Sequence, residues 1–250
     1  MKVAFVIKAL SHAGGGAERV LATVASGLAD RGHNVYVFTF DPEQSKPFYS
    51  LSSTVHLMNL EIGRTESHMT VADFAYRGVA LRQHLSELMP DVAVGFMHSS
   101  YIPLGVALIG KHIPVIGSEH TVAGHYERFR LQRWALRLAP LICDRITITS
   151  EQARSTFPTR MARAMNVVPN PVCIPNGTRS RHGYLGRPRV VLSVGRLSAE
   201  KDHARLIAAF SMIQPANPDW KLRIVGEGEL RGQLSNQIEE LGMGKCVELV

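Results

Sequence analysis

Two cations in the second half of the chain stand where they could bind a diphosphate. Arg196 and Lys201 follow an apolar run that ends at Gly195, and a helical pattern that includes Leu206 and Phe210 begins after them. A helix N-terminus offers unpaired N–H groups and a positive partial charge to an anion. An arginine can donate two hydrogen bonds to phosphate oxygens, and a lysine adds a point charge. The alternative is a surface turn with two solvated cations.

Three consecutive glycines, Gly14, Gly15 and Gly16, separate the first apolar run from the first helical pattern. Because glycine has no side chain, the backbone here can approach a ligand closely, and the helix N-terminus points toward that ligand. A dinucleotide-binding fingerprint would need a further glycine where Arg19 stands, which makes an NAD-dependent enzyme the weaker interpretation. A plain flexible turn is the remaining alternative.

His120 directly follows a predicted strand, and the carboxyl ends of parallel strands face the ligand crevice of a sheet. An imidazole at this place could hydrogen-bond a substrate hydroxyl or assist proton transfer. The chain has 11 histidines, so a structural histidine is the alternative interpretation. The neighbouring Glu119 is predicted to orient nearby groups rather than to contact a substrate.

The segment 125–141 has the pattern of an amphipathic helix. Its apolar side consists of Phe129, Trp134, Leu138 and Leu141. Its basic stripe consists of Arg130, Arg133 and Arg137. Three guanidinium groups at this helical spacing could bind a diphosphate or the anionic headgroups of a membrane. The alternative is a helix packed on the core with a solvated charged face.

Short apolar runs that alternate with helical patterns must position these side chains. The expected strands are 3–7, 35–40, 55–60, 92–96, 115–117, 146–149, 190–194, 221–225 and 246–250. The alternation indicates an α/β fold, in which a parallel sheet carries helices on both faces. The segment 171–189 is rich in Pro, Gly, Asn and Arg and lacks periodicity. We therefore predict that it links a domain at 1–170 to a second domain at 190–250.

Composition limits the partners and the compartment. A net charge of +7 favours anionic partners, and nucleic acid is the weaker choice because no zinc finger or aromatic-interleaved basic motif is present. Three cysteines without a C-x-x-C pair argue against a disulfide framework or zinc site and favour a reducing, cytoplasmic compartment. No apolar run approaches the roughly 20 residues that span a bilayer. No D-x-D stands at a strand end, so chemistry without a metal is expected.

Several of these segments, taken in order, resemble the retaining glycosyltransferases of family 4, which have the GT-B fold. The segments are 14–20 (GGGAERV), 118–120 (SEH), 144–151, 168–171 (VPNP), 195–202 (GRLSAEKD) and 226–230 (GEGEL). Each motif alone is weak, but the ordered set is specific, and it runs from Lys2 to Val250. The closer likeness, carried by 116–120, the basic stretch after it and Cys143–Asp144, is to enzymes that extend lipid-diphosphate-linked oligosaccharides.

The resemblance implies two Rossmann-like domains that face each other across a cleft, the second of them truncated. Catalysis is then expected from His120, Arg196 and Lys201. The donor or its phosphates are expected at Gly16, Gly195, Arg196, Lys201, Glu227 and Gly228. The acceptor is expected at Gly15, Gly16, His120, Arg130, Arg133 and Arg137.

The expected reaction moves a hexose or N-acetylhexosamine from a nucleotide sugar, with UDP as the expected nucleotide, to a lipid-linked saccharide. Two cations would stabilise the charge on the leaving diphosphate, so no cofactor or metal is expected. The protein is expected to be cytoplasmic and peripheral on the membrane. In the family the second domain continues with a Glu-x7-Glu motif that binds the donor sugar and ribose, so an incomplete donor site is expected here. The alternatives are a non-catalytic fragment that binds acceptor or membrane, and an NAD-dependent enzyme.

Overall fold

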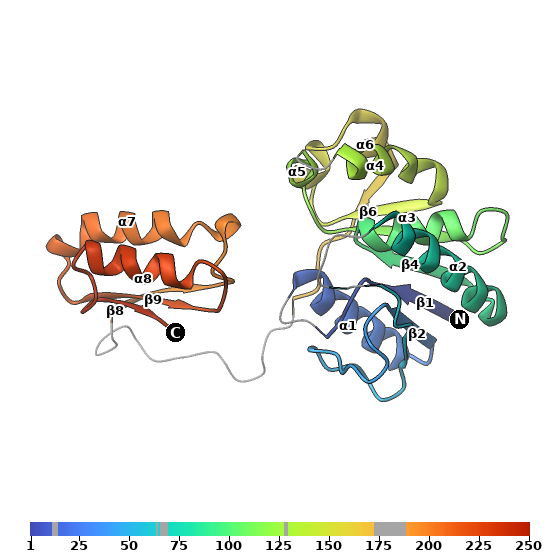
Figure 1. Cartoon of the computed structure of the whole chain (residues 1–250), viewed down its shortest axis with the longest axis horizontal. Helices are drawn as coiled ribbons and strands as arrows, with labels where there is room; N and C mark the ends of the chain where they lie inside the picture. Colours follow the sequence, from blue (N-terminus) through green and yellow to red (C-terminus); the bar gives the residue numbers. More distant parts are fainter. Residues whose placement is uncertain (12–14, 64, 66–69, 128–129, 173–188) are drawn as a thin grey trace. The chain divides into compact units, whose positions relative to one another are not determined.

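The computed structural model describes residues 1–11, 15–63, 65, 70–127, 130–172 and 189–250, without the side chains of Arg130 and Leu131. The chain divides into two compact units, residues 1–174 and 175–250 (Figure 1). Most of the segment predicted to be a linker, 171–189, lies outside the described residues, and its last residue already belongs to a strand.

The first unit is built on a seven-stranded sheet with the order β3-β2-β1-β4-β5-β6-β7. Every neighbouring pair of these strands is parallel. The strands are β1 Lys2–Val6, β2 Asn34–Thr39, β3 His56–Asn59, β4 Val92–Phe96, β5 Val115–Glu119, β6 Arg145–Ile148 and β7 Met165–Val167. The α/β fold predicted from the alternating patterns is confirmed.

Helices cover both faces of this sheet, because successive strand side chains point to opposite faces. On one face, α1 (Gly16–Ala29) packs on Val3 and Phe5 of β1. On the other, α2 (Val71–Leu88), α3 (His98–Ala107) and α4 (Arg130–Ile142) form a second cluster with Ala4 and Val6 (Figure 1). The shorter helices are η1 Ala123–Tyr126, α5 Glu151–Ser155 and α6 Thr159–Ala164.

Two strand glycines bring α3 close to the sheet. A Cβ added to Gly95 in β4 would lie 2.5 Å from the Cα of Tyr101, and one added to Gly117 in β5 would lie 3.1 Å from its ring. The Tyr101 side chain is therefore fully buried between α3 and these strands. This packing places its hydroxyl beneath the carboxyl end of β5, where Glu119 stands.

The predicted helix over 125–141 is correct only in its second part. Residues 123–126 form the 3₁₀ turn η1, Glu127 lies in a turn, and the α-helix begins at Arg130. The side of α4 that packs on the core carries Leu136 and Ala139. The predicted apolar side is instead exposed at Trp134 (67%), Leu138 (47%) and Leu141 (64%), while Phe129 lies outside the described residues.

The second unit has a three-stranded parallel sheet with the order β10-β9-β8. Its strands are β8 Arg189–Val194, β9 Trp220–Val225 and β10 Val247–Leu249. The helices α7 (His203–Ile213) and α8 (Arg231–Glu240) pack on the same face of this sheet (Figure 1). Two short 3₁₀ turns, η2 Ala199–Lys201 and η3 Gln214–Ala216, flank α7.

Candidate active-site elements

The strand order of the first unit reverses at β1, because β2 lies on one side of it and β4 on the other. Ligands of open α/β sheets bind outside the carboxyl ends of the strands at such a reversal. The segment after β1 reaches Gly15 and Gly16, where α1 begins. A Cβ on Gly16 would meet nothing within 4 Å, so packing alone does not require glycine there. Gly14 lies outside the described residues.

A buried aspartate that sequence analysis missed anchors the chain before this glycine segment. Asp41, which follows β2, is 1% exposed. Its Oδ2 accepts hydrogen bonds from the N–H groups of Leu10 (2.6 Å) and Ser11 (3.2 Å), and its Oδ1 accepts one from the Ser11 hydroxyl (2.7 Å). The only sequence signal for this role is an acidic residue directly after the second apolar run.

His120 lies at the carboxyl end of β5, as predicted. Its ring stacks on Phe96, with 5.1 Å between the centroids, and its Nε2 lies 3.0 Å from the Ser118 hydroxyl. Within the described part of the chain, Nδ1 makes no hydrogen bond. Burial lowers the pKa of His120, so the imidazole is neutral near pH 7. A neutral imidazole can both donate to and accept from a sugar hydroxyl.

Glu119 is 1% exposed, so its carboxylate faces the protein interior rather than a ligand. Burial raises the pKa of this carboxyl group, and four hydrogen bonds, two from tyrosine hydroxyls and two from backbone N–H groups, act in the opposite direction. The predicted orienting role therefore has a definite set of partners, all of them within the first unit.

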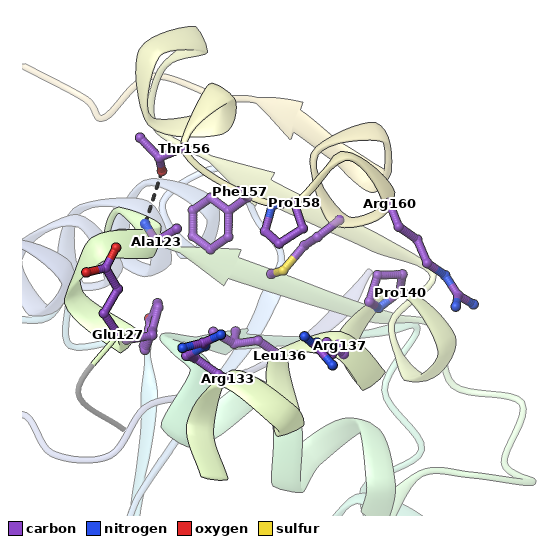
Figure 2. A pocket seen from close by; sticks show the side chains of 12 residues that line it. Ala123, Glu127, Arg133, Leu136, Arg137, Pro140, Thr156, Phe157, Pro158 and Arg160 are labelled. Carbon is purple, nitrogen blue, oxygen red and sulfur yellow. Dashed lines mark hydrogen bonds between the residues drawn. The ribbon is translucent and has the colours of Figure 1, made fainter. Parts of the chain in front are cut away.

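A pocket of about 680 Å³ opens between α4 and the segment from α5 to α6. Figure 2 shows its two walls, with Arg133 and Arg137 of α4 facing Phe157 and Pro158. Its lining includes the apolar side chains of Leu136, Phe157, Pro158 and Met161. Its charged lining residues are Glu127, Arg133, Arg137 and Arg160.

The structure thus brings two of the three predicted stripe arginines, Arg133 and Arg137, to one pocket. The side chain of the third, Arg130, lies outside the described residues. Arg160 was missed, because nothing in its local pattern connects α6 to the basic helix. The Arg137 guanidinium also lies over the exposed Trp134 ring, 5.1 Å from its centroid.

In the second unit, the loops after β8 and β9 are joined at the carboxyl end of the sheet. The Gly195 N–H donates to the Val225 carbonyl (3.0 Å), and the Leu197 N–H donates to the Glu227 carbonyl (2.9 Å). A Cβ on Gly228 would lie 2.3 Å from the Leu197 carbonyl oxygen. Close approach of the two loops therefore requires glycine at 228, independently of any ligand.

Arg196 and Lys201 both lie at this edge, in the connection from β8 to α7. The buried His203, another residue that sequence analysis missed, has its Nε2 3.2 Å from the Arg196 carbonyl oxygen. The Lys201 side chain passes over Gly195, with its Cγ and Cδ 3.7 Å from the place of a Cβ there. A Cβ at residue 195 would thus be in ordinary van der Waals contact with the lysine stem, so packing alone does not require glycine there.

The Glu227 carboxylate is held by Arg231, which sequence analysis also missed. Arg231 donates to Glu227 (3.2 Å) and to the Leu249 carbonyl (3.2 Å), so it joins the loop after β9 to β10. The spacing of Glu240 and Glu248 happens to fit Glu-x7-Glu, but Glu248 lies within β10 and pairs with Arg223 at 2.9 Å.

Two further observations concern metals and membranes. Among the described residues, no group of three or more His, Cys, Asp or Glu side chains could hold a metal ion. Over the same residues, no helix has both the length and the apolar character needed to cross a membrane.

The two units, each with a parallel sheet covered by helices, have the architecture of the GT-B-type glycosyltransferases. Across all 250 residues, the chain superposes on a lipopolysaccharide outer core galactosyltransferase with a TM-score of 0.70 at 20% identity, covering 67% of that chain. It also superposes on the Anabaena protein HepE in complex with UDP, with a TM-score of 0.69 at 18% identity, covering 69% of that chain. These likenesses show the fold.

The chain belongs to glycosyltransferase family 4. The model of that family matches residues 14–174, and the model of glycosyl transferases group 1 matches residues 178–250. The resemblance inferred from the ordered motifs is confirmed.

The chain is also similar in sequence to curated proteins over nearly its whole length. It is 28% identical over 245 residues to a Campylobacter jejuni enzyme, "GalNAc-alpha-(1->4)-GalNAc-alpha-(1->3)-diNAcBac-PP-undecaprenol alpha-1,4-N-acetyl-D-galactosaminyltransferase". It is 24% identical over 250 residues to an uncharacterized glycosyltransferase of Haemophilus influenzae. The chain spans 66% and 68% of the length of these two relatives.

Proposed function

We propose that the protein transfers a hexose or N-acetylhexosamine from a UDP-sugar, with retention, to a saccharide carried on a lipid diphosphate. The observation that carries the acceptor assignment is the pocket beside α4. It combines an apolar lining with Arg133, Arg137 and Arg160, and an amphiphile with an anionic head matches both parts. The Campylobacter relative, whose acceptor is named as a diphospho-undecaprenol saccharide, supports this choice.

His120 is the residue we propose for the acceptor sugar. It lies at the carboxyl end of β5 with a neutral imidazole. On the donor side, we propose that Arg196 and Lys201 bind the diphosphate and stabilise its charge as the glycosidic bond breaks. Glu227 and Gly228 of the same unit would line the donor site. For Gly228, however, the close contact with the neighbouring loop already explains why glycine stands at this position.

We also propose peripheral attachment to an anionic membrane through α4. Trp134, Leu138 and Leu141 expose an apolar stripe on this helix, and Arg133 and Arg137 lie next to it. Apolar side chains flanked by cations are typical of helices that lie in the membrane interface. This placement would bring the pocket to the surface where a lipid-linked acceptor resides.

The pocket assignment is tested by removing its cations. In the double variant Arg133→Ala, Arg137→Ala, we expect the Kd for farnesyl diphosphate to rise about 10- to 100-fold, because charge-assisted hydrogen bonds to phosphate are lost. Isothermal titration calorimetry in detergent-free buffer, below the micelle concentration of the probe, measures this change.

Arg31→Ala is the matched control, because Arg31 is exposed beyond α1, on the other face of the sheet. It removes one positive charge from the other face of the sheet, where the double variant removes two from the pocket. We expect it to change the Kd by less than about twofold, since distant surface charges are screened by salt. Equal affinities in the wild type and the double variant would contradict the assignment.

The proposed donor chemistry uses no metal ion. We therefore expect the Kd for UDP in excess EDTA to stay within about twofold of the Kd in Mg²⁺, since Arg and Lys would supply the positive charge to the diphosphate. Calorimetric titration of the 250-residue chain in both buffers makes the comparison. A tighter complex that requires Mg²⁺ would contradict the metal-independent mechanism.

A further inference from the structure

One buried carboxylate holds the segment after β5 at both of its ends. The Oε1 of Glu119 accepts hydrogen bonds from the N–H groups of His120 (2.9 Å) and Thr121 (3.0 Å), where the segment begins. Its Oε2 accepts one from the hydroxyl of Tyr126 (3.0 Å), where η1 ends. The Tyr101 hydroxyl of α3 donates to the same Oε2 (2.8 Å).

The segment held in this way connects the two parts of the proposed acceptor site. His120 stands at its start, and Ala123, Tyr126 and Glu127 at its end line the pocket beside α4. A change in the hydrogen bonds of Glu119 would therefore alter the position of the histidine relative to the pocket wall. One end is held by Oε1 and the other by Oε2 of the same carboxylate, so they cannot shift independently.

A second, independent feature fixes Tyr126 from the side of β4. The Nδ1 of His98 lies 3.0 Å from the Tyr126 hydroxyl. Burial is the main reason that the pKa of His98 falls to about 4, so its imidazole is neutral at pH 7. A tyrosine hydroxyl has one hydrogen. Because that hydrogen is given to Glu119, the hydroxyl accepts a hydrogen bond from the Nδ1–H of His98.

The backbone that presents His98 is strained. Met97, between β4 and α3, has φ 65° and ψ 152°, a conformation that a side-chain-bearing residue rarely adopts. Its N–H donates to the Ser118 carbonyl (2.8 Å), which ties it to β5. Such strain persists where the surroundings fix it and is concentrated at functional sites.

We propose that Glu119 is a positioning residue that sets the spacing between His120 and the diphosphate pocket. The proposal rests on the proposed function. A ligand bound at two points gains affinity from the second point only if both are held at the right separation beforehand. Glu119, Tyr126 and His98 provide this preorganisation, and the saccharide and the diphosphate of one acceptor are then bound together.

The test compares two probes, farnesyl diphosphate and farnesyl-diphospho-N-acetylgalactosamine, by calorimetry with the 250-residue chain. The wild type is expected to bind the sugar-bearing probe more tightly. In Tyr126→Phe this gain, measured as the ratio of the two dissociation constants, should fall about 3- to 10-fold, the effect of one lost hydrogen bond. Glu119→Gln should show the same pattern. If this variant does not fold, Tyr126→Phe alone tests the proposal.

Tyr101→Phe is the matched control. It removes the other hydroxyl from the same carboxylate oxygen and keeps the ring, but Tyr101 is not among the residues that line the pocket. It should lower the melting temperature about as much as Tyr126→Phe and leave the gain intact. Loss of the gain in both variants would show a purely structural role and would overturn the proposal.

The proposal would also be overturned if the gain persisted in Tyr126→Phe, or if the wild type showed none. In those cases the dependence of farnesyl diphosphate binding on Arg133 and Arg137 would still uphold the proposed function. A wild type that bound neither probe would instead refute the proposed function, and this proposal with it.

Discussion

Replacement of Arg196 by alanine is expected to weaken UDP binding about 10- to 100-fold, because a guanidinium that donates to phosphate forms charge-assisted hydrogen bonds. The position of this residue supports the expectation. It follows β8 at the carboxyl end of the sheet, and its carbonyl oxygen is held by the buried His203. Isothermal titration of UDP into the 250-residue chain gives the two dissociation constants.

Arg189→Ala is the control for the loss of charge. Arg189 begins the same strand at the opposite, amino end and pairs with Asp219 at 3.7 Å on an exposed surface. We expect this variant to bind UDP as the wild type does, since exposed ion pairs contribute little. If Arg196→Ala left the Kd unchanged, the diphosphate assignment would be wrong.

Gly228→Ala is expected to destabilise the second unit by about 3 kcal/mol, the upper range for overpacking of a closely packed site. The new Cβ would lie 2.3, 2.7 and 2.8 Å from backbone atoms of Leu197, none of which can rotate away. The loops would have to separate and break the hydrogen bonds of Leu197 with Glu227 (2.9 Å) and Leu230 (3.0 Å). Urea unfolding followed by the fluorescence of Trp220 in β9, with the exposed Trp134 replaced by phenylalanine in all variants, reports on this unit.

Gly232→Ala is the matched control in the same unit. Gly232 lies within α8, and a Cβ there would meet nothing within 4 Å. Because alanine favours helix more than glycine does, this variant should gain about 0.5–1 kcal/mol. An unfolding free energy for Gly228→Ala equal to that of the wild type would show that the two loops can separate without penalty.

The central strands of the first unit could be predicted from the sequence because they are buried on both faces of their sheet. Such strands read as continuous apolar runs, and 92–96 corresponds residue for residue to β4. The helix predicted over 125–141 was wrong at its start. The hydroxyl of Tyr126 is bonded to Glu119, and the chain turns there before α4 begins. The apolar periodicity of the sequence does not reveal such a contact.

The sequence by itself determined the α/β fold, the glycosyltransferase family and the local identity of the candidate groups, such as His120 and Arg196. These conclusions follow from local spacing, from apolar periodicity and from motifs whose order is fixed by the chain.

Only the tertiary structure decided which distant groups act together. Arg160 shares a pocket with Arg133 and Arg137 because α6 packs beside α4. Asp41 is separated from Leu10 by 31 residues but accepts its hydrogen bond. The two ends of the segment after β5 meet on one carboxylate only because the Glu119 side chain turns inward. The physical reason is that these contacts depend on the packing of separate elements, which no local pattern encodes.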